Sequence, residues 1–318
     1  MDVTDGPVAG IPLVLGGNVF GWTADEEDSF AVLDAFYEAG GRMLDTADVY
    51  SAWAPGHSGG ESEAVIGRWM ASRGVRSDMK IHTKTGMLSK QQIDDHMGHP
   101  SLYEPDAIMR HLDSSLERLQ TDYLDLYYAH RDFDGVSIEQ IVEGFAATVD
   151  AGKVRALGAS NFSAERLSAA LAHADSRGLV PFSVLQNEYN LVARDSYGED
   201  LQKLCISRGI AMLPFFGLAA GYLTGKYRQP EDFEQGERSR RVIEYKDSGK
   251  PVLAVMDKIA DETGASHPAI ALAWLRAQPG IPAPLASARN VEQLESLLDS
   301  TRLELSEEQV ERLTGSCA

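Results

Sequence analysis

The chain has 318 residues, of which 43% are hydrophobic and 24% are charged, a globular composition with ample material for a buried core. Its formal net charge of -19 argues against a surface for nucleic acid or for an anionic membrane, because phosphates would be repelled over most of the protein. Any anionic ligand must therefore be held by a local cluster of basic side chains.

Eight short apolar stretches recur along the chain and predict buried parallel strands. Each is largely apolar and mostly bounded by Gly, Asp or Asn. In chain order they are residues 11–17, 41–47, 79–86, 122–130, 153–161, 182–190, 210–216 and 281–288.

Amphipathic stretches between the strands predict helices. Residues 28–40 repeat apolar side chains at helical spacing and end on glycine, and residues 104–119 have Pro105 in the first turn. The second of these helices places four large aliphatic side chains on one stripe, Ile108, Leu112, Leu116 and Leu119. Further stretches with this pattern are 163–178, 200–209 and 290–300.

The alternation of strand and helix, eight times over, indicates an α/β protein with a parallel sheet. Without linkers between the units, it favours a single-domain (β/α)8 TIM barrel over an open doubly wound sheet. No second hydrophobic pattern marks a separate domain, so residues 1–318 are expected to form one.

Two long polar connections, at about 85–104 and 224–250, interrupt this rhythm. Loops of that size in a compact domain are usually functional lids or disordered excursions. For the second connection we expect disorder, with a lid as the alternative.

The N-terminus and the cysteines bear on the compartment. Cys205 and Cys317 are too few and too far apart for a disulfide framework, which fits a reducing cytosol. Residues 1–10 have neither the basic region nor the apolar core of a signal peptide, and no apolar run approaches membrane-spanning length. We expect a cytoplasmic protein with no membrane or nucleic-acid partner, acting as a monomer or weak homo-oligomer.

Polar or aromatic residues stand at nearly every predicted strand end, where active sites of such barrels lie. They are Asp45, Lys84, His130, Ser160, Asn161, Gln186, Phe215, Phe216, Ser287 and Arg289. Each alone has a structural explanation: a carboxylate or lysine can cap a turn, a histidine can be satisfied in the core, and a glutamine can bond loop backbone.

An Asp, a Lys and a His that converge with Tyr50 suit proton delivery to a carbonyl oxygen. An unperturbed tyrosine has a pKa of about 10, too high for easy acid–base work. A neighbouring ammonium, Lys84, would lower that pKa, and Asp45 would hold the lysine charged and oriented. His130 would orient the substrate oxygen, so Tyr50 is the predicted general acid.

The chain resembles the aldo-keto reductase family from about Leu13 to Leu298, on motifs that fall in order at strand ends. These are "LDTADVYS", "IHTKTG", "DLYYAHRD", "GASNF", "LQNEYN", "LAAGYLTGKY" and "SARNVEQL". The resemblance implies a barrel that reduces aldehydes or ketones with NADPH and has no Rossmann domain. Consistent with that, no G-x-G-x-x-G follows a predicted strand.

The resemblance also assigns the site residues. The catalytic residues are Asp45, Tyr50, Lys84 and His130, and the substrate pocket includes Trp22, Tyr50, Trp53 and His130. The nicotinamide carboxamide falls on Ser160, Asn161 and Gln186, with Phe215 stacking on the ring, and further cofactor contacts are Gly17, Asn18 and Asp45. The pyrophosphate falls on Gly217, Leu218, Gly221, Thr224 and Lys226, and the adenosine on Arg289 and Gln293.

Three departures from the family pattern bear on ligand contacts. Phe216 and Gly217 replace a Ser-Pro pair, which removes one hydroxyl near the phosphates. Leu297 replaces an asparagine that touches adenine in many members, and Arg131 follows His130 where some branches have tryptophan. The substrate pocket is therefore not that of those branches.

Two further possibilities remain. Asp94, Asp95, His96 and His99 cluster in a polar loop, but no cysteine or third histidine supports a site there, so we expect no metal. The alternative function is a cofactor-binding regulatory subunit, because potassium channel beta subunits resemble this family and keep the cofactor site. The complete set of catalytic residues favours the enzyme.

Overall fold

The computed structural model describes residues 6–8, 10–87, 100–133, 135–234 and 239–316. Eight parallel strands form one curled sheet in the order β7-β6-β5-β4-β3-β2-β1-β8. The strands are β1 (Val14–Gly16), β2 (Met43–Asp45), β3 (Lys80–Thr85), β4 (Leu126–Ala129), β5 (Leu157–Ser160), β6 (Phe182–Gln186), β7 (Ala211–Met212) and β8 (Leu285–Ala286). All eight lie within the predicted stretches.

The sheet closes on itself, as a barrel requires. The backbone N–H of Leu285 donates to the carbonyl of Pro214 at 2.9 Å, and that of Met212 donates to Gly280 at 2.9 Å. These bonds join the β7 and β8 segments, the two ends of the strand order. The (β/α)8 barrel predicted from the sequence is therefore confirmed.

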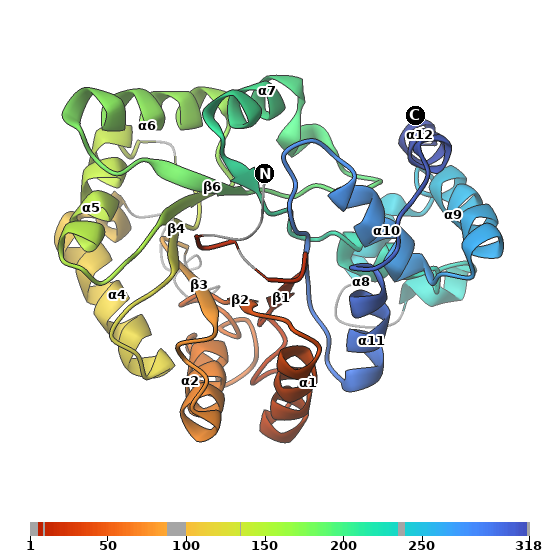
Figure 1. The fold of residues 1–318 in the computed structure, drawn as a ribbon, viewed down its shortest axis with the longest axis horizontal. Coiled ribbons are helices and arrows are strands. Elements are labelled where there is room, and N and C mark those ends of the chain that lie inside the picture. Colours follow the sequence, from red (N-terminus) through yellow and green to blue (C-terminus); the bar gives the residue numbers. More distant parts are fainter. Residues whose placement is uncertain (1–5, 9, 88–99, 134, 235–238, 317–318) are drawn as a thin grey trace.

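Helices surround the strands (Figure 1). The main helices are α1 (Glu26–Glu38), α2 (Glu61–Arg73), α4 (Pro105–Leu119), α5 (Ile138–Asp150), α6 (Ala164–Arg177), α7 (Glu199–Arg208), α10 (His267–Arg276) and α11 (Val291–Asp299). Outside this ring, α9 (Lys250–Thr263) and α12 (Glu307–Gly315) lie side by side. Several helices begin at a capping side chain, and Ser163 and Asn290 accept from backbone N–H groups of α6 and α11.

The core has two layers. Side chains inside the barrel form one cluster, Val14, Met43, Leu126, Tyr128, Val184, Leu213, Ala283 and Leu285. A larger cluster lies between the strands and the helices and contains the predicted α4 stripe, whose Ile108 and Leu112 are fully buried. Burying each such side chain stabilises the fold by roughly 1.5–3 kcal/mol. This packing holds the strands in place, and the site lies at their carboxyl ends.

The predicted long connections are partly helical. In the described part of 224–250 the chain forms η4 (Pro230–Glu234), α8 (Ser239–Val242) and η5 (Ile243–Tyr245) before α9 begins. Disorder is therefore the wrong expectation for this part, because Phe233, Val242 and Tyr245 bury their side chains in the outer core. In the first connection, η1 (Pro100–Tyr103) leads into α4.

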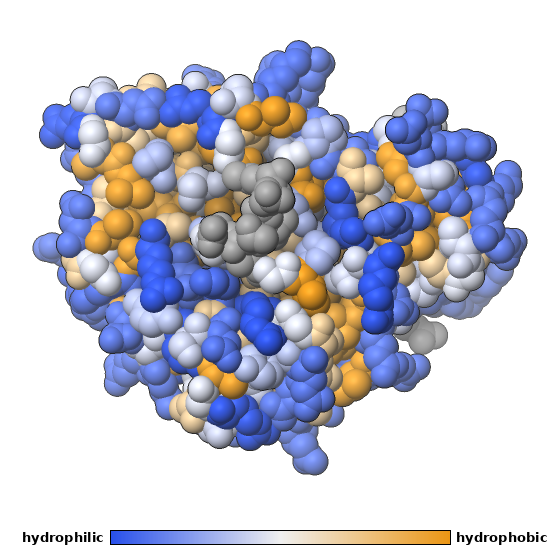
Figure 2. Space-filling view, in the orientation of Figure 1, coloured by the Kyte–Doolittle hydropathy of each residue, from blue (hydrophilic) through white to orange (hydrophobic). Residues whose placement is uncertain are grey.

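Some sequence predictions fall on residues that the structure does not describe. The predicted polar cluster of Asp94, Asp95, His96 and His99 lies outside the described residues, as does Cys317. Among the described residues, no helix is both long and apolar enough to cross a membrane. The face in Figure 2 is mostly hydrophilic along its outline, with smaller apolar areas between.

Candidate active site

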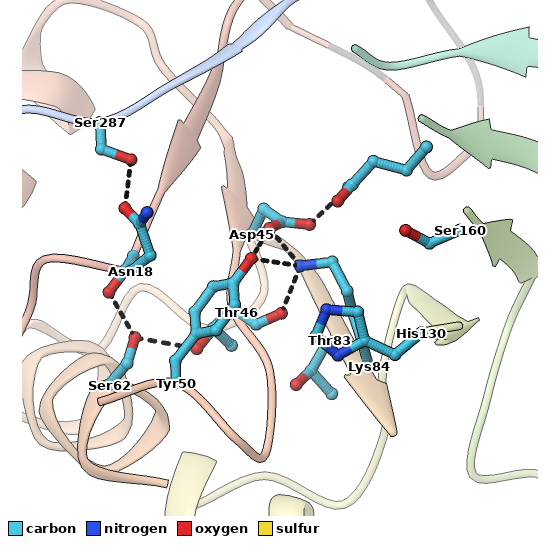
Figure 3. Close-up of polar contacts among 12 residues, drawn as sticks. Asn18, Asp45, Thr46, Tyr50, Ser62, Thr83, Lys84, His130, Ser160 and Ser287 are labelled. Atoms are coloured by element: carbon cyan, nitrogen blue, oxygen red, sulfur yellow. Dashed lines mark hydrogen bonds and ion pairs between the residues drawn. The ribbon is translucent and has the colours of Figure 1, made fainter. Parts of the chain in front are cut away.

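Lys84 is the centre of a buried hydrogen-bond network at the carboxyl end of the barrel strands (Figure 3). Its Nζ donates to Asp45 Oδ1 at 2.5 Å, to the Thr46 carbonyl at 2.9 Å and to the Tyr50 hydroxyl at 2.8 Å. Asp45 ends β2 and Lys84 lies near the end of β3, so adjacent parallel strands bring them together. Asp45 and Lys84 are both fully buried, so solvent and salt screen this ion pair much less than a surface pair.

Asp45 uses both carboxylate oxygens. Its Oδ1 accepts from Lys84 and, at 3.4 Å, from the Tyr50 hydroxyl. Its Oδ2 accepts from Gln186 Nε2 at 2.8 Å, from β6 on another side of the barrel. Asp45, which could have been a turn cap, is thus an ion-pair partner whose carboxylate is held by Lys84 and by Gln186.

The pKa of Tyr50 differs from the sequence expectation. We expected Lys84 to lower it, but burial and then the negative charge of Asp45 raise the pKa of Tyr50 well above its usual value. Burial likewise lowers the pKa of Lys84, against the opposing effect of Asp45. The contact with Lys84 is present as expected, but desolvation of the phenolate and the charge of Asp45 outweigh it. Tyr50 is therefore held in its protonated form.

His130 faces Tyr50 directly after β4. The two rings have centroids 6.1 Å apart and lie edge to face. Burial, with the nearby charges of Lys84 and Arg131, lowers the pKa of His130 well below its usual value. The imidazole is therefore neutral near pH 7, and its buried Nδ1 has no partner among the described residues. A neutral imidazole can hydrogen-bond a substrate oxygen without competing with Tyr50 as the acid.

Two tryptophan side chains pack beside the Tyr50 ring. The Trp53 ring lies 5.9 Å from Tyr50 and 5.5 Å from Trp22, centroid to centroid. Trp53 is 40% exposed, unusually open for so large an apolar side chain. The predicted pocket residues Trp22, Tyr50, Trp53 and His130 therefore lie together.

The end of β1 packs tightly on the same region. A Cβ atom at Gly17 would lie 2.7 Å from Ser62 Oγ, so only glycine fits there without a shift. Ser62 donates to the Gly17 carbonyl at 2.7 Å and bonds Thr46 Oγ1 at 2.8 Å. Next to it, Asn18 Oδ1 accepts from Ser287 Oγ at 2.6 Å (Figure 3). These hydroxyl contacts join the ends of β1, β2 and β8 around the Asp45 strand end.

The segment after β7 has an unusual backbone. Phe216, Ala219, Ala220 and Gly221 have positive φ angles of 53°, 48°, 56° and 103°. Left-handed conformation is strained for residues other than glycine, and such strain clusters at ligand sites. Three of these residues are consecutive, and the N–H groups of Ala219 and Gly221 donate to the carbonyls of Phe216 and Leu218 within the segment, at 2.7 and 2.9 Å. The predicted pyrophosphate residues Gly217, Leu218 and Gly221 lie in this segment.

The sequence of this chain is similar to those of known proteins. The sequence profile of the Aldo/keto reductase family matches residues 12–317. The chain belongs to the aldo/keto reductase family. It is 34% identical to a putative aryl-alcohol dehydrogenase of Saccharomyces cerevisiae, over 95% of this chain and 82% of the relative.

Two further relatives are similar over most of their length. An NADP(+) aryl-alcohol dehydrogenase of Phanerodontia chrysosporium is 32% identical, over 92% of this chain and 77% of that protein. A norsolorinic acid reductase of Emericella nidulans is 32% identical, over 96% of this chain and 78% of that protein. The family resemblance inferred from the sequence is confirmed.

The remaining predicted cofactor residues of this aldo/keto reductase line the same end of the barrel. Ser160 ends β5, and Asn161, in left-handed conformation, donates to the His130 carbonyl and to Ser160 Oγ, both at 3.0 Å. Phe215 is half-buried and lies edge to face with Phe216, with ring centroids 5.2 Å apart. Ser160, Asn161 and Phe215 thus lie at or just after the carboxyl ends of β5 and β7.

The predicted phosphate and adenosine residues make local contacts of their own. Thr224 donates to the Gly221 carbonyl at 2.7 Å, and Lys226 Nζ lies 5.1 Å from the Tyr227 ring centroid. The Arg289 backbone N–H donates to Gln293 Oε1 at 3.1 Å. In the described part of the chain, the exposed Arg289 guanidinium forms no ion pair, and Glu292 does not engage it.

Part of the 224–250 connection is tied to this region. Arg241 of α8 forms an ion pair with Glu188, and its guanidinium carbon lies 4.4 Å from the Phe216 ring centroid. The Tyr245 hydroxyl also donates to Glu188, at 3.4 Å. The contact places α8 against the residue next to Phe215.

Sequence reasoning missed a second polar cluster behind Lys84. Thr85 donates to Asp48 Oδ2 at 2.6 Å and bonds His111 Nδ1 at 2.9 Å. Burial, together with the nearby Glu63 carboxylate, raises the pKa of Asp48 to about 7. The acid inside the "DTADVY" motif was the available signal, because a carboxylate three residues after Asp45 must also lie near the strand end.

Proposed function

We propose that this aldo/keto reductase reduces an aldehyde or ketone to an alcohol by hydride transfer from NADPH, with Tyr50 as general acid. The observation that carries the proposal is the contact of Lys84 Nζ with both Asp45 and the Tyr50 hydroxyl. Membership of the family and the NADP(+) in the name of one relative support the activity and the cofactor.

The chain's own residues account for the proton. A carbonyl oxygen near the Tyr50 hydroxyl and the neutral His130 ring would receive two hydrogen bonds. As negative charge develops on that oxygen, the Tyr50 proton transfers to it and Lys84 stabilises the phenolate left behind. Bound NADPH supplies the hydride. The raised pKa of Tyr50 keeps the acid protonated before the reaction begins.

The residues around the barrel end fit a dinucleotide. Polar side chains of Ser160 and Asn161 suit a carboxamide, and the half-buried Phe215 ring suits stacking on a flat heterocycle. The family resemblance assigns the pyrophosphate to the segment after β7, and Lys226 supplies a cation beyond it. Within a chain of net charge -19, Arg289 supplies the cation that the extra phosphate of NADP requires.

We also propose aromatic aldehydes as the preferred substrate class. Trp22 and Trp53 offer edges and faces beside Tyr50, and aromatic rings gain roughly 0.5–1.5 kcal/mol from such contacts beyond area burial. Two relatives are named aryl-alcohol dehydrogenases, which agrees with an aromatic substrate.

The cellular compartment and the oligomeric state are further parts of the proposal. Cys205 is buried, and the chain has only one other cysteine, Cys317, which supports a reducing compartment. We propose a cytoplasmic protein that works as one domain, as a monomer or weak homo-oligomer.

A turnover assay tests the function. Benzaldehyde and NADPH are mixed with the full chain, NADPH absorbance is followed, and benzyl alcohol is quantified. Cyclohexanecarbaldehyde, similar in size but not aromatic, is the matched substrate control, and kcat/KM should favour benzaldehyde. NADPH binding without turnover of any carbonyl compound would instead favour the regulatory-subunit alternative.

A further inference from the structure

Gln186 joins the proposed cofactor platform to the proposed proton donor. It ends β6, is 1% exposed, and donates through Nε2 to Asp45 Oδ2 at 2.8 Å. The family resemblance gives Gln186 a contact with the nicotinamide carboxamide only. The bond to Asp45 adds a connection that this assignment does not include.

The bond fixes the orientation of the Asp45 carboxylate. An ionised carboxylate accepts through both oxygens, and here each has a different partner. Oδ1 takes Lys84 at 2.5 Å and Tyr50 at 3.4 Å, while Oδ2 takes Gln186. Without a donor on Oδ2, the carboxylate could rotate and accept more strongly from Tyr50.

The orientation matters for the acidity of Tyr50. The negative charge of Asp45 opposes ionisation of the Tyr50 hydroxyl, which lies close to Oδ1. A hydrogen bond donated to Oδ2 stabilises the carboxylate and weakens its hold on the Tyr50 proton. Gln186 therefore makes Tyr50 a stronger acid than Asp45 alone would allow.

We propose that Gln186 is a positioning residue that couples nicotinamide binding to the acidity of Tyr50. A glutamine amide has two N–H donors and one carbonyl acceptor. One N–H holds Asp45, the amide also contacts the Tyr128 hydroxyl, and the carbonyl can accept from a carboxamide N–H. Cofactor binding then holds the Gln186 side chain in one position, and Gln186 holds the orientation of the Asp45 carboxylate. The orientation of Asp45 in turn sets its hydrogen bonds to Lys84 and Tyr50. The inference rests on the proposed function.

Gln186→Met and Ser160→Ala test the coupling. Both remove a proposed carboxamide contact, but the Ser160 hydroxyl bonds Asn161 and not Asp45. Single-turnover hydride transfer is measured against pH at saturating NADPH and benzaldehyde. Both variants should bind NADPH more weakly. Gln186→Met alone should slow hydride transfer about tenfold at pH 7. It should also move the alkaline limb, the fall in rate at high pH as Tyr50 ionises, up by about one pH unit, the scale of one hydrogen bond to a charged group.

Two further variants separate positioning from loss of structure. In an Asp45→Asn background, Gln186→Met should shift the limb no further, because the two residues act through one bond. Gln186→Glu keeps the shape, and only its protonated form can donate to Asp45, so transfer should fall as the introduced carboxyl ionises. This variant also serves if Gln186→Met fails to fold, which thermal melting reports.

The outcomes distinguish this inference from the function beneath it. No NADPH-dependent turnover by the unmodified protein would remove the proposed function. Normal turnover with unshifted limbs in Gln186→Met, a wild-type rate in Gln186→Glu above the pKa of the introduced carboxyl, or an equal shift in Ser160→Ala would overturn the coupling alone.

Discussion

Replacing Arg289 with alanine should separate the two nicotinamide cofactors. The guanidinium is exposed and, within the described residues, has no carboxylate partner to lose. Asn290 caps α11 by accepting from the Gln293 N–H at 2.9 Å, and this side-chain bond survives the change. The substitution therefore removes one available cation and leaves the helix start intact.

The magnitude follows from the chemistry of one charged hydrogen bond. Such a bond contributes about 1.5–3 kcal/mol, and exposure places this one toward the lower end. NADPH should bind about 10- to 150-fold more weakly to Arg289→Ala. NADH has no phosphate on the adenosine ribose, so its dissociation constant should hardly change.

Dissociation constants for both cofactors, measured by titration at one ionic strength, are the assay. Arg302→Ala is the matched control, because it removes the same charge beyond the other end of α11. Arg302 is exposed and already paired with Asp299 at 3.2 Å. Equal losses for NADPH and NADH, or equal losses in both variants, would refute the assignment of the phosphate to Arg289.

Three other substitutions test the site and its electrostatics. Tyr50→Phe should leave NADPH affinity nearly unchanged and lower kcat by about 10²-fold or more, as for a removed general acid; near-normal turnover would exclude that role. Lys84→Met should lower kcat similarly and also cost about 3–5 kcal/mol of unfolding free energy in urea titrations, because it leaves Asp45 buried without its cation; an unchanged midpoint would contradict this. The pKa of Asp48 is raised to about 7, so the folded protein binds that proton more tightly than the unfolded chain and loses stability as pH rises toward 7. Asp48→Asn should therefore raise the melting temperature at pH 8, by a free energy on the order of 1–3 kcal/mol, and give no gain at pH 4, whereas a gain independent of pH would argue against the burial of this charge.

Periodicity alone was enough to predict the barrel. Every observed strand lies inside a predicted apolar stretch, because a strand buried on both faces reads as a continuous apolar run. The polar ends of those runs then located the site, since carboxyl ends of parallel strands meet at one mouth. Asp45, Lys84 and His130 were predictable for this reason.

The pKa shifts in the site were less predictable from the sequence than the residues that form it. Sequence gives the neighbours of Tyr50 but not how far they are removed from water, so the direction of its pKa shift was missed. The bond between Gln186 and Asp45 joins positions 141 residues apart, and no local pattern encodes it. Likewise, the side chains that order the 224–250 connection act through tertiary burial, which polar composition hides.

The left-handed residues after β7 set a limit on how stable this protein can become. Ala219 and Ala220 each adopt a conformation that costs roughly 1–2 kcal/mol for a residue with a Cβ atom. Glycine at these positions would relieve that cost in the folded state but would also loosen the loop when no ligand is bound. Substitutions at Ala219 and Ala220 should therefore exchange stability for loop order, so a search for heat-tolerant variants should measure activity together with stability at these two positions.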